Sequence, residues 1–409
     1  MQDDKLGIVV AGAGPAGLIA ALALAASGRD VTLLGTGPAP DDRRTTALMV
    51  PALSLLAEFG VVERLESAAA PLRTMRIVDA TGRLLRAPTV TFRAAEIGEE
   101  RFGLNIPNGH LNTVLAEAVE AHPRVAWKKS NVAAWDLTET AALGRLDDGT
   151  EVAASLVVAA DGRNSLARQR ANIHATRTEL PQAALVTNIE HSREHGGIST
   201  EFHKVTGPFT QVPLPGRRSS IVWVERPETA ELLRELEAEA LARRIEDRMD
   251  SMLGKVSLAG PRQVWRLAHG RPDRFAARRV ALVGEAAHVI PPIGAQGLNL
   301  SVADIRTLVD IVAREGDDPG ARGVLEEYDR RRRIDILARS TAVNLLNHSL
   351  LSGFLPAQAL RAAGLATLAA FPPLRAFFMR EGLRPGSGFG ALAGIVRADR
   401  GLGKQVGRQ

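Results

Sequence analysis

The residues Gly12-Ala13-Gly14-Pro15-Ala16-Gly17 decide the fold of this 409-residue chain. They form the pattern GxGxxG between an apolar run at 6–11 and a run rich in Ala and Leu at 18–27. The first glycine permits a tight turn, the second lets a pyrophosphate approach the backbone, and the third lets helix and strand pack closely. The helix N-terminus adds free N–H groups and a partial positive charge. The pattern predicts a dinucleotide-binding turn of the Rossmann type.

A second strand is expected at 31–34, which completes a βαβ unit of about 30 residues. An acidic residue commonly ends this strand and holds the ribose 2′-OH of the dinucleotide. Here Gly35 stands in its place. Three alternative partners for the ribose remain, namely Asp41, Asp42 and Thr36.

The composition narrows the classes of protein that this chain can form. Hydrophobic residues make up 45% and charged residues 24%, as in globular proteins, and the length fits two or three domains or one large α/β body. The absence of cysteine excludes disulfides, thiol nucleophiles, zinc ribbons and iron–sulfur clusters. Lys plus Arg number 51 and Asp plus Glu 46, and the net charge of +5 gives no reason to expect nucleic-acid binding. Residues 3–5 are charged, and no run of 18 apolar residues is free of charge. We therefore expect neither a signal peptide nor a transmembrane helix.

The rest of the chain mixes helical and strand patterns. We expect helices at 46–59, 111–121, 298–314 and 324–347, strands at 152–159 and 279–283, and a charged helical insertion at 229–249. Alternating runs at 209–214 and 220–224 predict an antiparallel sheet. The four arginines at 330–333 predict a solvated helix face.

Two further motifs follow strands. The first is VVAADGRNS at 157–165, in which an apolar strand enters an Asp-Gly turn. The second is RVALVGEAAH at 279–288, which continues as PPIGAQGLN at 291–299 and leads into a long helix starting near Leu298. A helix N-terminus behind a loop of small residues stabilises negative charge, such as the charge on the pyrimidine ring of a reduced flavin.

With these three motifs in this order, the chain resembles the class A flavoprotein aromatic hydroxylases, which have a p-hydroxybenzoate-hydroxylase-like fold. Within that class it is most similar to the ubiquinone-biosynthesis hydroxylases. The stretches that carry this second resemblance are RTTAL at 44–48, NIPN at 105–108, and the residues at 207–214 and 220–223. The resemblance covers nearly the whole chain.

The resemblance implies an α/β fold with a Rossmann-like FAD-binding domain of the GR2 type, an inserted antiparallel β-sheet substrate domain and C-terminal helices. The expected divisions are 1–180 for the first part of the FAD-binding domain, with a small β insertion at about 72–107, then 181–270 for the substrate domain, 271–350 for the second part of the FAD-binding domain, and 351–409 for a C-terminal helical segment with a basic tail.

The resemblance also implies a cofactor site. The glycine turn would contact the FAD pyrophosphate, Arg44 the cofactor, Asp161 both FAD and the passing nicotinamide nucleotide, and Glu285 the ribityl chain. The expected cofactor-binding residues are Gly12, Ala13, Gly14, Pro15, Ala16, Gly17, Arg44, Asp161, Gly284, Glu285, Pro292, Gly294, Ala295, Gln296, Gly297, Leu298 and Asn299, with Pro292 near the isoalloxazine. The chain departs from the family pattern at Gly109, Glu285, Pro291 and 294–295, where relatives commonly carry Arg, Asp, His and Ala-Gly.

The implied activity is that of an FAD-dependent monooxygenase that hydroxylates an aromatic, phenolic and polyprenylated ring in ubiquinone biosynthesis. NADH or NADPH would reduce FAD as a transient co-substrate, and O2 would form a C4a-hydroperoxyflavin. We expect no metal site, because His191 and His195 stand in a surface-like context. No catalytic side chain is assigned. His288 is expected to be a packed residue, and Tyr328 a poor base.

The C-terminal segment is apolar up to Met379, and seven basic residues follow from Arg375 onward. Two interpretations remain open, a core-packing helix with a solvated tail or a peripheral membrane contact. We expect a cytoplasmic protein, with association at the cytoplasmic membrane face or with a quinone-biosynthesis complex as alternatives.

Three rival functions are a hydroxylase of a soluble aromatic or secondary metabolite, a non-catalytic scaffold, and an NAD-dependent dehydrogenase. The second Gly-acid motif at 284–285 argues against the dehydrogenase, since one dinucleotide needs no such second contact.

Overall fold

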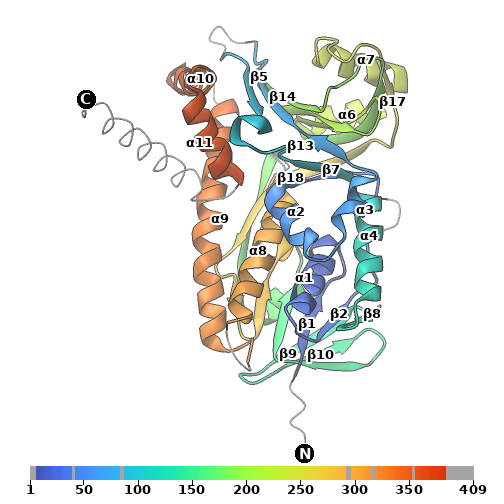
Figure 1. Cartoon of the computed structure of the whole chain (residues 1–409), viewed down its shortest axis with the longest axis vertical. Helices are drawn as coiled ribbons and strands as arrows, with labels where there is room; N and C mark the ends of the chain where they lie inside the picture. Colours follow the sequence, from blue (N-terminus) through green and yellow to red (C-terminus); the bar gives the residue numbers. More distant parts are fainter. Residues whose placement is uncertain are drawn as a thin grey trace, which may run out of the picture.

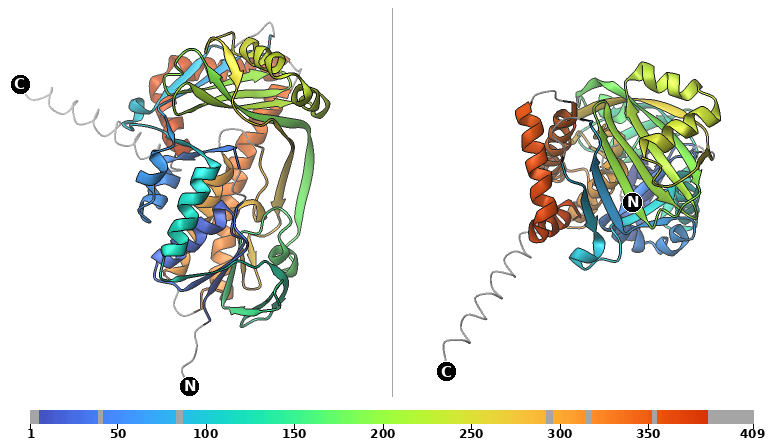
Figure 2. Two further views of the ribbon diagram at one scale, coloured as in Figure 1. Left: turned by 90° about the vertical axis from the view of Figure 1, so that its right-hand side faces the viewer. Right: turned by 90° about the horizontal axis from the view of Figure 1, so that it is seen from above.

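The computed structural model describes residues 6–38, 42–82, 87–291, 296–314, 318–351 and 355–383. Two sheet-based halves follow one another along the long axis of the molecule, and helix α9 runs along one side (Figure 1). Two long strands, β13 and β18, connect the halves (Figure 2). The α/β fold class expected from the sequence is confirmed.

A six-stranded sheet carries all three sequence motifs. Its order is β19-β20-β12-β1-β2-β8, and β1 pairs in parallel with both β2 and β12. The strands are β1 (Ile8–Ala11), β2 (Val31–Leu34), β8 (Val125–Lys128), β12 (Leu156–Ala159), β19 (Ala276–Ala277) and β20 (Val280–Leu282). Because β20, β12 and β1 are parallel neighbours, the loops after their carboxyl ends meet at one edge of the sheet.

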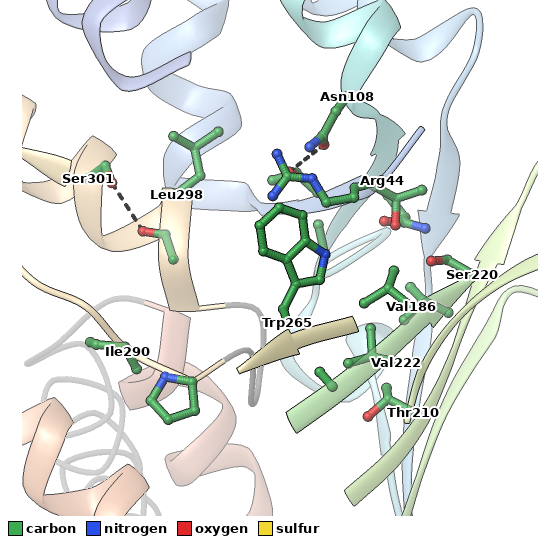
Figure 3. Close-up of a pocket in the computed structure, with 18 of the residues that line it drawn as sticks. Arg44, Asn108, Val186, Thr210, Ser220, Val222, Trp265, Ile290, Leu298 and Ser301 are labelled. Atoms are coloured by element: carbon green, nitrogen blue, oxygen red, sulfur yellow. Dashed lines mark hydrogen bonds between the residues drawn. The ribbon is translucent and has the colours of Figure 1, made fainter. Parts of the chain in front are cut away.

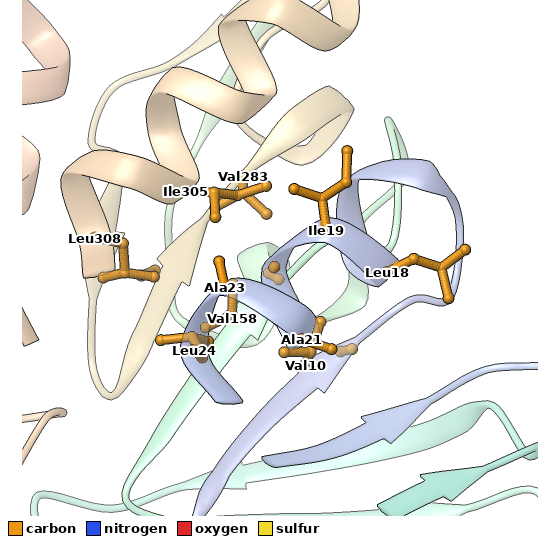
Figure 4. Packing of buried hydrophobic residues seen from close by; sticks show 14 of the residues in the cluster. Val10, Leu18, Ile19, Ala21, Ala23, Leu24, Val158, Val283, Ile305 and Leu308 are labelled. Carbon is orange, nitrogen blue, oxygen red and sulfur yellow. The ribbon is translucent and has the colours of Figure 1, made fainter. Parts of the chain in front are cut away.

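Helix α1 lies at the centre of the main core. Leu18, Ile19 and Leu24 on this helix are buried against Val10 of β1 and residues of helix α8 (Figure 4). This explains its nearly uniform apolar sequence. The helices of this half are α1 (Pro15–Ala26), α4 (Asn108–Ala121), α5 (Leu166–Arg170), α8 (Gln296–Val312) and α9 (Arg322–Leu351), with the short 3₁₀ helix η2 (Gly284–Ala286).

An eight-stranded, mostly antiparallel sheet forms the other half. Its order is β17-β13-β16-β15-β14-β5-β6, with β18 also paired to β13. The strands are β5 (Thr74–Asp79), β6 (Val90–Arg93), β13 (Ala175–His191), β14 (Ile198–Lys204), β15 (Gly207–Leu214), β16 (Arg218–Glu225), β17 (Val256–Leu258) and β18 (Gln263–Pro272). Leu185, Phe209 and Trp223 on one face are buried in a cluster with residues of α6 (Pro227–Glu235) and α7 (Ala238–Arg248). The opposite face is therefore available to line a cavity.

Two three-stranded sheets complete the β structure, in the orders β11-β10-β9 and β3-β7-β4. The strands are β3 (Thr45–Met49), β4 (Ala70–Leu72), β7 (Gly103–Pro107), β9 (Val132–Leu137), β10 (Ala142–Leu146) and β11 (Glu151–Ala154). The remaining helices are α2 (Val50–Ala57), α3 (Val62–Glu66), η1 (Ala94–Ile97), α10 (Leu355–Ala370) and α11 (Pro372–Leu383).

The helix expected at 46–59 is wrong at its beginning. Thr45–Met49 is instead strand β3, which pairs antiparallel with β7. The helix starts at Val50, and Pro51 is tolerated there because the first helical turn needs no backbone donor. Two β-branched threonines before it favour the extended conformation.

Within the described ranges, no helix is long and apolar enough to cross a membrane. Helix α11 packs against the edge of the eight-stranded sheet through Met379, which shares a cluster with Ala94 and Phe102. Arg375 also donates to the Glu96 carboxylate at 2.8 Å. The C-terminal helices thus border the β5–β6 end of this sheet.

Tyr328 of α9 ties that helix to the strand that precedes the second Gly-acid motif. Its buried hydroxyl donates to the Leu282 carbonyl at 2.6 Å, and burial raises the pKa of the phenol well above 10. We expect Tyr328→Phe to lower the free energy of unfolding by about 1–2 kcal/mol, because a buried acceptor loses its donor. Urea denaturation followed by circular dichroism measures this effect, and an unchanged midpoint would contradict it.

Candidate active site

A cavity of about 750 Å³ lies between the carboxyl edge of the six-stranded sheet and the inner face of the eight-stranded sheet. Side chains from both halves line it (Figure 3). Arg44, Leu298 and Ser301 come from the side of the motif loops, and Val186 and Val222 come from the large sheet (Figure 3). Concave sites of this size between two structural units are typical places for ligands.

The glycine turn has the geometry that its sequence predicts. Gly12 has a φ of +106°, and a Cβ there would lie 2.4 Å from the Ala160 carbonyl oxygen. A Cβ on Gly17 would lie 1.7 Å from the Gly12 carbonyl oxygen. A Cβ on Gly14 would meet nothing within 4 Å, and Gly14 lines the cavity together with Pro15 and Ala16. The N-terminus of α1 therefore opens on the cavity, with Ala13 buried behind it.

Asp161 follows β12 but supports its own loop. Its Oδ2 accepts from the Ala167 backbone N–H at 3.2 Å, at the start of α5. Burial raises the pKa of the Asp161 carboxyl, and its Oδ1 is buried with no hydrogen-bond partner among the described residues. The flanking residues Ala160, Gly162 and Arg163 line the cavity.

Glu285, in the second Gly-acid motif, reaches toward the Asp-Gly loop. Its carboxylate pairs with Arg163, at 3.2 Å from Nε and 3.4 Å from Nη2. Both side chains line the cavity and remain solvent-accessible. The Glu285 side chain is thus used for an ion pair that joins two motif loops.

A buried ionic network lies beneath this loop. Asp304 of α8 binds His288 Nε2 at 2.7 Å through Oδ2 and Arg332 Nε at 2.8 Å through Oδ1. The Gly284 backbone N–H also donates to Asp304 Oδ2, at 3.2 Å. His288 is therefore a packed residue, as expected. Asp304 was not predicted from the sequence, although its spacing of three and seven residues from Ser301 and Gly297 places it on the same helix face.

The expectation of a solvated face at 330–333 is wrong for Arg332, which is only 3% exposed. Helical periodicity places Arg332 four residues after the buried Tyr328, on the inner face of α9. Arg330, Arg331 and Arg333 pair with acidic residues on their own helix. One arginine of the four thus neutralises the buried Asp304 carboxylate.

Arg44 is held at the cavity by Asp42 and Trp265. Its Nε and Nη2 donate to Asp42 at 2.9 and 2.7 Å, and its guanidinium lies 5.0 Å from the centre of the Trp265 ring. Asn108 Nδ2 also donates to Asp42, at 3.0 Å. Burial would raise the pKa of Asp42, but these hydrogen bonds outweigh it and lower the pKa. The Asp42 carboxylate therefore already accepts from four donors, namely Nε, Nη2 and the backbone N–H of Arg44, and Nδ2 of Asn108.

The N-terminus of α8 also opens on the cavity through Gly297, Leu298 and Ser301. Asn299 instead clamps β3, since its Nδ2 donates to the Ala47 carbonyl at 2.7 Å and its Oδ1 accepts from the Met49 N–H at 2.8 Å. Of the other expected residues, Pro292, Gly294 and Ala295 lie outside the described residues, as do the Gln296 side chain and Asp41. Thr36 is exposed.

Across the described ranges, no three His, Asp or Glu side chains gather as metal ligands. The expectation that His191 lies at the surface is wrong, because it is only 6% exposed. Its Nε2 lies 2.9 Å from Ser219 Oγ, and burial lowers its pKa. The alternating burial pattern of β13 places the His191 side chain on a buried face of the sheet.

The residues present fit FAD. The Gly14 position leaves open space where a phosphate can approach the backbone, and two helix N-termini face one cavity. Asp161 itself does not line the cavity among the described residues; its neighbours Ala160, Gly162 and Arg163 do, so it can act on the cofactor space only through its loop. The site therefore combines an anion-binding end with an aliphatic end, as a dinucleotide cofactor beside an apolar substrate requires.

Comparison with known proteins defines the class. The model of the FAD binding domain family matches residues 5–339. The solved structure of p-nitrophenol 4-monooxygenase PnpA from Pseudomonas putida has a TM-score of 0.74 at 21% identity, covering 94% of this chain and 98% of that one. A variant of HpxO from Klebsiella pneumoniae, solved with FAD, also gives 0.74, at 18% identity and covering 93% and 99%. The chain belongs to the FAD binding domain family and is an FAD-dependent monooxygenase.

Among characterised sequences, the chain is similar to ubiquinone hydroxylases over nearly its full length. Ubiquinone hydroxylase UbiL of Rhodospirillum rubrum is 32% identical, covering 93% of this chain and 90% of that protein. The 3-demethoxyubiquinol 3-hydroxylase of Escherichia coli is 28% identical, covering 89% and 95%. The resemblance inferred from the motifs is confirmed.

The structure explains why Gly35 replaces the usual acid at the end of β2. Its φ is +134°, and a Cβ would lie 2.8 Å from the Ala13 backbone nitrogen. We expect both Gly35→Ala and Gly35→Glu to lower the FAD content of the purified protein, although the second variant restores an acid. The flavin released from denatured protein, measured by absorbance per chain, tests this.

Gly28→Ala is the matched control, because Gly28 has a φ of +89° and open space around its Cβ position. It should carry only the backbone cost of about 1–2 kcal/mol and keep its FAD. Tighter FAD binding by Gly35→Glu would contradict the steric explanation.

Proposed function

We propose that this protein hydroxylates the ring of a phenol carrying a polyprenyl chain, in ubiquinone biosynthesis, with O2 and NADH or NADPH as co-substrates. The observation that carries the proposal is the aliphatic inner face of the eight-stranded sheet, which faces the cofactor end of the same cavity. Its apolar members are Met75, Ile77, Phe92, Ala184, Val186, Val212 and Val222. The ubiquinone hydroxylases to which the chain is similar support the choice of substrate class.

Bound FAD supplies electron transfer from the nicotinamide nucleotide to O2 and the delivery of one oxygen atom to the ring. In this proposal, the N-terminus of α1 at Gly14 holds the pyrophosphate, and Arg44 contacts the cofactor near the loop of Asp42. The N-terminus of α8, at Gly297 and Leu298, borders the isoalloxazine. Positive helix ends at both places stabilise the negative charges of the cofactor.

The other motif residues position these loops. Asp161 orders the start of α5, and this holds the flanking residues Ala160, Gly162 and Arg163 at the cavity. Glu285 accepts from Arg163 and closes the cavity next to the ribityl region. The apolar sheet face excludes water from the ring, which would limit the loss of reduced oxygen as hydrogen peroxide before it is transferred.

The most informative test is turnover by the FAD-loaded protein under ¹⁸O₂. We expect a prenylated phenol to give a hydroxylated product carrying one ¹⁸O atom for each NADH or NADPH oxidised, because the aliphatic face binds the chain. Mass spectrometry of the product and nucleotide absorbance measure the ratio.

Two results would support the rival functions. Turnover of short phenols without turnover of prenylated ones would favour a hydroxylase of soluble aromatic metabolites. Stable FAD uptake without any hydroxylated product, from a broad panel of phenols, would favour a scaffold.

Part of the substrate proposal concerns a membrane surface. Met75 and Phe92 line the cavity and also pack in the cluster that contains Met379 of α11. Phe371, just before α11, and Phe378, on α11, are 60% and 52% exposed. An exposed aromatic helix next to the apolar end of the cavity suits a substrate that resides in the bilayer.

We expect the protein to co-sediment with vesicles of phosphatidylethanolamine and phosphatidylglycerol. The double variant Phe371→Ser/Phe378→Ser should bind at least about tenfold more weakly, because two apolar side chains no longer enter the lipid. Leu232→Ser is the matched control, since Leu232 is 71% exposed on α6, which packs on the other face of the sheet. Equal binding by the double variant and the control would overturn this surface assignment.

A further inference from the structure

One carboxylate that lines the cavity, that of Glu201, has no part in the proposed binding of the cofactor. Among the described residues that line it, two are acidic, Glu201 and Glu285. Glu285 is paired with Arg163 between the motif loops. Glu201 lies on β14, on the face of the large sheet that meets the substrate end.

Glu201 is held by the histidine two residues further along its strand. His203 Nε2 lies 2.8 Å from Glu201 Oε1, and the histidine is only 1% exposed. An ionised carboxylate can only accept, so Nε2 carries the hydrogen of this bond. His203 Nδ1 is buried without a partner among the described residues. The histidine therefore serves Glu201 and no other described group.

The second carboxylate oxygen, Glu201 Oε2, has no hydrogen-bond partner in the described part of the chain. Glu201 pairs with Thr210 of β15 on one side and with Ile77 of β5 on the other. Thr210 points into the cavity from the same sheet face as Val186 and Val222 (Figure 3). Ser199, Thr210 and Ser220 line the cavity from the same sheet, so the carboxylate and these hydroxyls form the polar part of a wall that is otherwise apolar. Of these groups, the carboxylate is the strongest acceptor for a donor on the substrate.

Among the described residues, the other charged or titratable side chains around the cavity are either paired already or unable to accept a proton. Arg44 and Arg163 are paired with acids, and His288 is bound to Asp304. Arg76 of β5 and Arg266 of β18 also line the cavity, and cations cannot accept a proton. A phenolic hydroxyl is a donor that fits an acceptor set in an apolar wall.

We propose that Glu201 accepts the hydrogen bond of the substrate's ring hydroxyl and takes its proton during hydroxylation, with His203 as its positioning residue. This rests on the proposed function. The O–H bond breaks, the proton moves to Glu201 Oε2, and the electron pair stays on the phenolic oxygen and enriches the ring carbon that receives oxygen. As the C–O bond forms at that carbon, the O–O bond of the oxygen reduced by two electrons from NADH or NADPH breaks. The carbon then loses its proton, which leaves with the second oxygen atom as water, and Glu201 returns its proton to the phenolic oxygen as the ring becomes aromatic again.

Two variants at Glu201 separate the parts of this role. Glu201→Gln keeps an acceptor but removes the base, and we expect kcat for the phenol to fall about 100-fold, with loss of the acidic limb of the kcat/KM pH profile. FAD content and phenol binding should stay at wild-type levels. Glu201→Leu should also lose the preference for the phenol over its methyl ether, measured as Kd from the absorbance change of bound FAD.

Two further variants complete the test. Glu190→Gln changes an exposed carboxylate of the same sheet and should match wild type in every measurement. His203→Gln should lower kcat less than Glu201→Gln, because Gln also carries an N–H donor, and it should keep the acidic limb.

The outcomes distinguish this proposal from the one on which it rests. A wild-type protein that hydroxylates no phenol overturns the proposed function and this proposal together. Hydroxylation by wild type that Glu201→Gln retains at full rate, with the same pH profile, overturns the assignment of Glu201 alone. An unchanged preference between phenol and methyl ether in Glu201→Leu does the same.

Discussion

The site depends on backbone hydrogen bonds that continue between β20, β12 and β1 beyond the strands themselves. The Val283 N–H donates to the Ala159 carbonyl at 3.0 Å, and the Ala160 N–H donates to the Ala11 carbonyl at 2.7 Å. These bonds bring three loops that are far apart in the sequence to neighbouring positions at one sheet edge. The glycine turn, the Asp-Gly turn and the Gly-Glu turn can form one site only while this register holds.

Two kinds of support keep the register in place. On the side of the helices, the buried Asp304 of α8 binds the Gly284 backbone, His288 and Arg332. These bonds fix the Gly-Glu turn to α8 and α9. On the opposite side of the cavity, the paired strands β13 and β18 extend from the first half to the second (Figure 2). They carry the eight-stranded sheet, whose inner face lies opposite the loops. The cofactor end and the substrate end are therefore built by different parts of the chain and joined by paired strands.

The sequence predicted the features that depend on local geometry. The contact that requires Gly17 lies within one strand–turn–helix unit, whereas the contact that requires Gly12 comes from Ala160, far along the chain; the helix after the glycine turn was expected within a few residues. Asp304 and Arg332 could not be paired from sequence, because their contact depends on how α8 and α9 are rotated against each other. The beginning of the helix expected at 46–59 was wrong because pairing with β7, which is over 50 residues away, holds Thr45–Met49 extended.

Glu201 was missed for the same reason. Its position in the cavity depends on the parallel pairing of β14 with β5, between segments more than 100 residues apart. A strand pattern alone gives two faces and does not say which one meets the cofactor. Gly35 was read as a missing acid, whereas its closeness to the Ala13 backbone makes glycine the residue that fits.

The proposed function requires that the three motif loops and the sheet face hold one flavin and one phenol in the same cavity. The most direct measurement is the visible absorbance of the FAD-loaded protein during titration with a phenol. We expect one FAD per chain and a saturable change of the flavin bands, because the ring of the phenol would bind against the cofactor. Flavin bands that stay unchanged while the phenol binds elsewhere, or a chain that takes up no FAD, would contradict it.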